Sequence, residues 1–367
     1  MTRADAGSKQ PCTVAATGEA RGGSRTDWAS EPEEVADNIF RVPLPVHVDG
    51  LRAVNVYVLR DEERIDLVDG GDAQATSIEQ LDAALRRVGT KVEDIGNIYV
   101  THVHPDHYTL AVAVRRAVGA TVHLGSGEHP ALDAIERLAR GEREPHVRAD
   151  LQRVGGQELE SLIEADRLSP SVPPGLWGQP DTWLTGGTTV AASTGDLDIV
   201  HTPGHTRGHL VYADRHRSAW FTGDHVLPHI TPSIGFESQP VPTALSDYLR
   251  SLEHLLTLPD ARMLPAHGPT QDSTHARIRE LLQHHEERLA ATLDAVRAGG
   301  STPYEVAGRL HWTSRKKPFG QLGAWHRYLA STETSVHLET LVARGALVRA
   351  TSRDKTEVFE PAAPQVA

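Results

Sequence analysis

The stretch IYVTHVHPDH, residues 98–107, places three histidines and an aspartate directly after a short apolar run. The run is rich in β-favouring residues and predicts a buried strand that ends where the histidines begin. His102 and His104 lie two positions apart, so on extended backbone their side chains point the same way. Pro105 prevents the strand from simply continuing, and a turn into a helix would aim Asp106 and His107 at a second point nearby. The stretch therefore predicts two half-sites for metal ions.

Three later segments repeat the pattern of a strand followed by a polar residue beside a glycine. They are DIVHTPGHTRGH at 198–209, AWFTGDH at 219–225 and RMLPAHG at 262–268, which contain His205, Asp224 and His267. The neighbouring glycines, Gly204, Gly223 and Gly268, permit close backbone approach and positive φ values, as a loop wrapped around an ion requires. These segments are predicted to supply the missing ligands.

The ordered motifs HxHxDH, TPGHTxGH, GD and AHG resemble those of the metallo-β-lactamase-fold hydrolases, over roughly residues 38–297. The resemblance implies two metal sites and a shared ligand: His102, His104 and His205 for one ion, Asp106, His107 and His267 for the other, and Asp224 bridging both. Every position of this two-metal pattern is filled in the sequence. The resemblance therefore implies an active member of the family.

Two divalent metal ions are the cofactors that the resemblance implies. A ligand set of histidines and carboxylates without cysteine suits zinc, and iron or manganese would also accept it. A water between two such ions loses its proton near neutral pH, while the ions polarise the substrate oxygen. Hydrolysis is the expected reaction, with Asp106 and Asp224 as catalytic carboxylates. A GxSxG nucleophile motif is absent from the sequence, in agreement with this chemistry.

Other polar residues near these motifs are interpreted as supports. An isolated histidine is more often a packing residue than a ligand, so His201, His209 and His225 are predicted to lie beside the ligands without binding metal. Asp69, in the segment IDLVDGG, resembles the strand-end aspartate that the family places beneath the metal loop. It is expected to position a ligand.

Composition agrees with a cytoplasmic enzyme. The chain of 367 residues is long enough for one large and one small domain, and its single cysteine excludes a disulfide framework. No apolar run is long enough to span a membrane, so no membrane association is expected. The stretch 1–30 lacks the apolar core of a secretory signal and is predicted to be a disordered leader. The formal net charge of −12 disfavours a nucleic-acid-binding surface over the whole protein.

The order of elements predicts an α/β fold, an αββα sandwich, for residues 31–272. Strands are expected at 38–42, 54–59 and 65–69, followed by a helix with apolar residues at helical spacing. Residues 139–187 are less regular, helical at first and then broken by prolines at 169–177. This insertion is predicted to form part of a substrate lid with Trp177 and Trp183 as apolar contacts, and a structural linker with packed tryptophans is the alternative.

The remaining residues, 273–367, predict a separate C-terminal module. Apolar positions from Ile278 to Val296 predict a long helix, and the TPYE segment at 302–305 is a capping box for the next one. Further helices are expected at 322–329 and 335–344, followed by a β-ribbon from 346–349 and 356–359. Three short helices and a ribbon resemble a winged helix, and the whole tail resembles that of the group containing the mitochondrial lactamase-like endoribonuclease.

The substrate is the least determined feature. Residues 301–360 contain nine Lys or Arg against six Asp or Glu, a weak excess for a DNA-binding module, so nucleic acid is not the expected partner. The tail is interpreted as shaping the active site or forming a homodimer. The favoured function is hydrolysis of an ester or thioester of a small metabolite, as in glyoxalase II-like thioesterases. A lactonase, an endoribonuclease acting on phosphodiesters and a ligand-sensing winged-helix regulator are the alternatives.

Overall fold

The first half of the chain builds a seven-stranded sheet whose strands follow sequence order. The computed structural model describes residues 29–46, 51–140, 146–165, 175–237, 239–313 and 316–363, so nearly all of the predicted leader lies outside the described residues. The first four strands pair antiparallel, and the strands from β4 to β7 pair in parallel. The strands are β1 Glu33–Ala36, β2 Ile39–Pro45, β3 Ala53–Arg60, β4 Ile65–Val68, β5 Ile95–Tyr99, β6 Thr121–Gly125 and β7 Thr182–Leu184.

A five-stranded sheet with the order β12-β11-β10-β9-β8 packs against the first sheet. Its strands are β8 Thr189–Ala192, β9 Gly195–His201, β10 Leu210–Asp214, β11 Ala219–Gly223 and β12 Arg262–Pro265. Apolar residues of both sheets form one buried cluster between them. Within it, the rings of Tyr57 and Phe221 meet edge to face with centroids 5.2 Å apart, and the Tyr57 hydroxyl donates to the Pro265 carbonyl at 2.8 Å. These contacts join the two sheets within the shared cluster.

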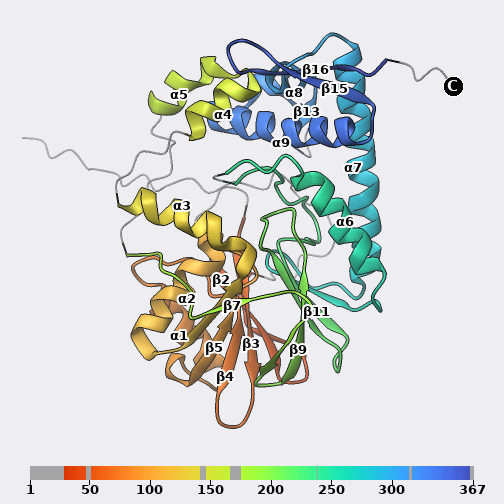
Figure 1. Cartoon of the computed structure of the whole chain (residues 1–367). Coiled ribbons are helices and arrows are strands. Elements are labelled where there is room, and N and C mark those ends of the chain that lie inside the picture. Colours follow the sequence, from red (N-terminus) through yellow and green to blue (C-terminus); the bar gives the residue numbers. More distant parts are fainter. Residues whose placement is uncertain are drawn as a thin grey trace, which may run out of the picture.

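Helices cover both outer faces of the paired sheets (Figure 1). α1 Ser77–Arg87, α2 Pro105–Val118 and α3 His129–Ala139 cover the larger sheet, and α6 Ala244–Leu256 and α7 Thr274–Arg297 cover the smaller one. The layer order helix, sheet, sheet, helix is the one predicted from the sequence. None of the described helices combines the length and apolar character that crossing a lipid bilayer requires.

The predicted insertion at 139–187 divides into two parts that pack in different places. α4 His146–Val154 and α5 Glu160–Ala165 form the helical half and share a small core with the C-terminal helix α9 Ala324–Ala343. Trp177 stacks near Tyr108 of α2 at 6.1 Å, and Trp183 lies in β7 beside His129. Most of the proline-rich run at 169–177 lies outside the described residues. Both tryptophans are partly buried against the core of the larger sheet.

The C-terminal module begins with α7, whose Ser273 cap accepts from the Ala276 amide. α8 Pro303–Gly308 has the predicted capping box of Thr302 and Glu305. β13 His311–Trp312 and β14 Lys317–Pro318 form a small hairpin, and β15 Leu347–Thr351 and β16 Glu357–Pro361 form the predicted ribbon.

The prediction of two helices at 322–329 and 335–344 was wrong, because α9 is continuous from Ala324 to Ala343. The intervening residues include Ser331, Thr332 and Thr334, which are weaker helix formers than alanine, and these polar positions obscured the periodicity. Hydroxyls of Ser331 and Thr334 donate to backbone carbonyls four residues earlier, at 2.8 Å each, so these buried polar groups are satisfied inside the helix.

A histidine pair is buried where α7 meets α9. The rings of His285 and His337 lie 5.7 Å apart, and His337 Nδ1 donates to the Glu333 carbonyl at 2.8 Å. Burial, assisted by the nearby cation Arg288, lowers the pKa of His337 to about 3, although the hydrogen bond to the Glu333 carbonyl opposes this shift. The folded module therefore holds this imidazole in its neutral form.

We expect acid to weaken the fold through His337. In the unfolded chain the imidazole takes up a proton near pH 6.5, whereas in the folded chain it does not until far lower pH, so stability falls as pH drops below 6.5. The loss from this group is roughly 2 kcal/mol between pH 7 and pH 5. Urea unfolding followed by tryptophan fluorescence should show a smaller pH dependence for His337→Gln than for wild type. His216→Gln, at an exposed position between β10 and β11, is the control, and an unchanged dependence in His337→Gln would contradict this account.

Candidate metal centre

Four strand ends bring the predicted ligands to one edge of the sandwich. β5 leads into His102, and His104 is the cap residue of α2, so Asp106 and His107 lie in the first helical turn. His205 lies in the loop between β9 and β10, Asp224 follows β11, and His267 follows β12. The three predicted glycines, Gly204, Gly223 and Gly268, all have positive φ. Loops from both sheets therefore meet at this edge.

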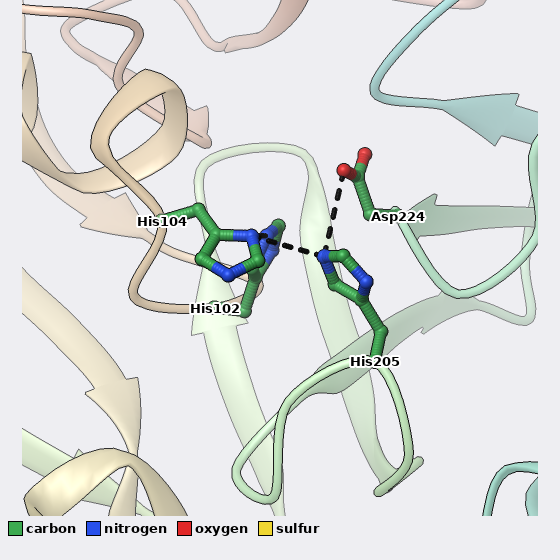
Figure 2. A group of neighbouring side chains, drawn as sticks. All are labelled: His102, His104, His205 and Asp224. Carbon is green, nitrogen blue, oxygen red and sulfur yellow. Dashed lines mark hydrogen bonds and ion pairs between the residues drawn. The ribbon is translucent and has the colours of Figure 1, made fainter. Parts of the chain in front are cut away.

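The first group of ligands consists of three imidazoles and a carboxylate (Figure 2). His104 Nδ1 lies 2.9 Å from His102 Nε2 and 3.0 Å from His205 Nε2. Asp224 Oδ2 lies 3.6 Å from His205 Nε2. One ion can reach all four side chains, because their donor atoms lie within 4.8 Å of one another.

The second group consists of Asp106, His107 and His267, whose donor atoms also lie within 4.8 Å of one another. Asp106 Oδ2 lies 3.3 Å from His267 Nε2 and 3.6 Å from His107 Nε2. The other oxygen of Asp224, Oδ1, lies 3.4 Å from His267 Nε2 and 3.7 Å from His107 Nε2. The carboxylate of Asp224 thus faces the first group with one oxygen and the second group with the other.

Hydrogen bonds from the opposite ring nitrogens orient most of these imidazoles. His107 Nδ1 donates to Asp69 Oδ2 at 2.9 Å, His205 Nδ1 to the Ser233 carbonyl at 2.8 Å, and His267 Nδ1 to the Ala53 carbonyl at 2.8 Å. Each bond selects the tautomer that leaves Nε2 available to a ligand.

Asp69 supports two of the ligands at once. Its Oδ1 accepts from the Thr101 amide at 2.8 Å and from the Thr101 hydroxyl at 3.0 Å, and that hydroxyl lies 3.0 Å from His102 Nδ1. Asp69 has a φ of 63°, which aspartate tolerates better than most residues. The predicted supporting role of Asp69 agrees with these contacts.

The charges of the site are arranged to receive a cation. Burial lowers the pKa of His104 to about 3, so this ring is neutral. Burial alone would also lower the pKa of His107, but the carboxylates of Asp106, Asp69 and Asp224 outweigh it and raise that pKa to about 10. The carboxylates therefore stabilise positive charge in the space that they share with His107.

Buried polar atoms of the site fit bound metal. Within the described part of the chain, His107 Nε2, His267 Nε2 and Asp224 Oδ1 are buried and have no hydrogen-bond partner. Such atoms are costly to bury unless a ligand satisfies them. These three converge on one point, so the residues present fit a divalent cation held by nitrogen and carboxylate donors.

The three histidines next to the ligands in sequence, His201, His209 and His225, lie outside the two groups and make other contacts. His201 Nε2 donates to the Arg207 carbonyl at 2.9 Å. His209 Nε2 accepts from the Asp224 amide at 3.2 Å, and its ring lies 5.1 Å from that of His102. His225 is buried against the ring of Tyr248.

One segment of the site was missed from the sequence. The loop between β11 and α6, residues 225–243, supplies the Ser233 carbonyl that orients His205. The guanidinium of Arg277 in α7 donates to the carbonyls of Leu227 and Ile230, and Phe236 packs against Trp325 of α9. Backbone carbonyls are not encoded by residue type, so no sequence pattern marks this segment.

Asn55 was also missed. Its side-chain amide donates to the Pro265 and Gly268 carbonyls, at 2.8 Å each, and so holds the loop that contains His267. A buried asparagine in an otherwise apolar strand was the signal that could have identified it.

Comparisons with known proteins agree with this geometry. The profile of the Metallo-beta-lactamase superfamily matches residues 49–267. A beta-lactamase-like protein 2 homolog from Caenorhabditis elegans is 30% identical over 70% of this chain and 70% of its own. A hydroxyacylglutathione hydrolase from Albidiferax ferrireducens is 28% identical over 62% of this chain and 66% of its own. The lactamase-like protein adaB of Aspergillus niger is 26% identical over 72% of this chain, and the match spans 66% of its length.

A solved structure extends the similarity beyond the matched profile. A metallo-beta-lactamase family protein from Thermus thermophilus superposes with a TM-score of 0.70 and 25% identity, covering 88% of this chain and 98% of that one. Its coverage includes the sandwich and much of the rest of the chain. From the matched profile, the ordered ligands and the shared fold, this chain belongs to the metallo-beta-lactamase superfamily.

Proposed function

We propose that this protein is a dinuclear metal-dependent hydrolase that acts on an ester or thioester carbonyl of a small metabolite. The observation that supports it best is the placement of Asp224, whose two oxygens face two different ligand groups 3.4 to 3.7 Å away. A carboxylate in this position can bridge two ions. The set of nitrogen and carboxylate donors favours zinc, with iron or manganese as the other metals that accept it.

Two divalent ions in these groups would lower the pKa of a shared water and polarise the substrate carbonyl. The protein's own residues prepare the site for that chemistry. Asp224 lies between the two groups and faces both. Asp106 places a second carboxylate beside His267 and His107. Asp69 keeps the His107 ring in one tautomer. Asp106 and Asp224 are the proposed catalytic carboxylates.

The proposed bond type draws on the relatives. Hydroxyacylglutathione hydrolase is named for hydrolysis of an acylated thiol, and its similarity covers 62% of this chain. The substrate class that we propose for this chain is therefore a thioester or ester of an acyl-CoA, a carrier-bound acyl chain or a related metabolite. We propose that the protein acts in the cytoplasm.

The C-terminal module is proposed to shape the site or to mediate a homodimer rather than to bind DNA as a winged helix. Two of its arginines are already engaged with acids: Arg344 donates to both oxygens of Glu286, at 2.7 and 2.8 Å, and Arg349 donates to Glu339 at 2.6 Å. Pairing of this kind reduces the positive charge available to phosphates.

Metal content tests the dinuclear site. Wild type saturated with Zn²⁺ and desalted should hold close to two ions per chain by elemental analysis, and Asp224→Ala should hold far fewer because both groups lose an oxygen donor. Asp196→Ala, at an exposed carboxylate in β9, should match wild type. One ion or fewer in saturated wild type would count against the proposal.

A substrate panel tests the bond type. Metal-loaded protein should cleave aryl esters, acyl-CoAs or lactones, with cleavage lost in Asp224→Ala, when product release is followed by absorbance. Turnover of single-stranded RNA without any carbonyl turnover would instead support a phosphodiesterase. Binding to duplex DNA that weakens steeply with salt would support the regulator.

Asp69→Asn tests the support beneath the metal loop. The amide keeps the size of the carboxylate but removes the charge that favours the Nδ1 proton of His107. We expect a fall of about 10- to 100-fold in metal affinity or turnover, the range found for partners of metal-binding histidines. Thermal unfolding should be measured beside it, and wild-type affinity in a folded Asp69→Asn protein would contradict this role.

A further inference from the structure

The turn between β6 and α3 lies against the metal loop between β9 and β10 at three glycines. A Cβ added to Gly125 would lie 2.1 Å from the Gly208 carbonyl oxygen, and one added to Gly127 would lie 2.6 Å from the Gly208 Cα. A Cβ on Gly208 would lie 2.3 Å from the Glu128 amide nitrogen. Three glycines thus allow two segments, far apart in sequence, to meet with no side chain between them.

This contact delivers a carboxyl group into the interior. Glu128 ends the short 3-10 turn Ser126–Glu128 and is 0% exposed. Its Oε1 accepts a hydrogen bond from the Thr206 hydroxyl, one residue after the ligand His205. The Val103 amide, which lies between the ligands His102 and His104, also stabilises the Glu128 carboxyl. The side chain is therefore bonded to the loop that carries His205 and is influenced by the loop that carries His102 and His104. Figure 2 shows these three histidines converging.

A buried carboxyl lowers stability unless its surroundings compensate for lost hydration. Burial raises the pKa of Glu128 to about 8, although the Thr206 hydroxyl opposes this shift and its neighbour Glu237 adds to it. Oε2 of Glu128 is buried and has no hydrogen-bond partner among the described residues. An apolar residue would fill this place at lower cost, so packing alone does not account for the carboxyl.

We propose that Glu128 is a positioning residue for the first metal site, joining the His102–His104 loop to the His205 loop so that the three imidazoles converge. His102 and His104 follow a strand of the larger sheet, whereas His205 lies in a loop of the smaller one. The Thr206 hydroxyl beside His205 donates to the Glu128 carboxyl, and the Val103 amide between His102 and His104 favours the ionised form of that carboxyl. The second group depends on other contacts, namely those of Asp69 with His107 and of Ala53 with His267. This inference rests on the proposed metal-dependent function.

Selective weakening of one site is the predicted signature. In Co²⁺ titrations followed by visible absorbance, Glu128→Ala should bind one ion as wild type does and the other about 10- to 100-fold more weakly. The spectrum at one equivalent should resemble that of His205→Ala, which lacks a ligand of the first site. Glu128→Gln, whose amide oxygen can still accept from the Thr206 hydroxyl, should restore most of the affinity. Glu333→Ala removes a carboxyl of α9 near Arg288 and should leave both affinities unchanged.

Thr206→Val provides a second route to the same result, because it removes the hydroxyl donor and retains the side-chain shape. Wild-type affinity at both sites in folded Glu128→Ala and Thr206→Val, or equal loss at both sites, would overturn the positioning role. Failure of saturated wild type to bind two ions would instead overturn the proposed function. The two failures are therefore distinguishable in one set of titrations.

Discussion

The packing of one sheet on the other is the constraint on which the site depends. His102, His104, Asp106 and His107 follow β5 of the larger sheet, whereas His205, Asp224 and His267 follow strands of the smaller one. Neither sheet alone assembles an ion site with all these donors. The apolar cluster between the sheets and the hydrogen bond from Tyr57 to the Pro265 carbonyl hold the two sets of loops at bonding distance.

A second constraint is that the protein buries carboxylates at that edge without enough positive charge of its own to balance them. Three carboxylates, Asp69, Asp106 and Asp224, lie among buried imidazoles. Three atoms that could bind metal, His107 Nε2, His267 Nε2 and Asp224 Oδ1, have no hydrogen-bond partner among the described residues. Such an arrangement is unfavourable by itself and favourable around cations. The packing energy of the fold therefore offsets the cost of burying a site suited to metal. Hydrogen bonds from His107, His102 and His205 to Asp69, Thr101 and Ser233 hold the ligand rings in place.

The C-terminal module contributes to the same edge through the loop 225–243. α7 holds that loop through Arg277, and α9 holds it through Trp325 and through Val336, which packs against Gly235. The loop in turn supplies the carbonyl bonded to His205. The module and the metal site are thus joined by a short path of contacts, whereas the predicted lid at 139–187 packs on α2, β6 and α9 in its described parts.

The sequence by itself indicated the candidate ligands, the order of the layers and the start of the capped helix α8, because strand periodicity, capping residues and motif spacing are local properties. It could not show that α9 is one helix, because polar residues at buried positions interrupt its apolar pattern. Ser331 and Thr334 can be buried there because their hydroxyls donate to carbonyls four residues earlier. It also could not reveal the roles of Ser233, Ala53 and Glu128. Their contributions depend on which backbone groups the tertiary structure brings beside a histidine loop, and no residue type encodes that proximity.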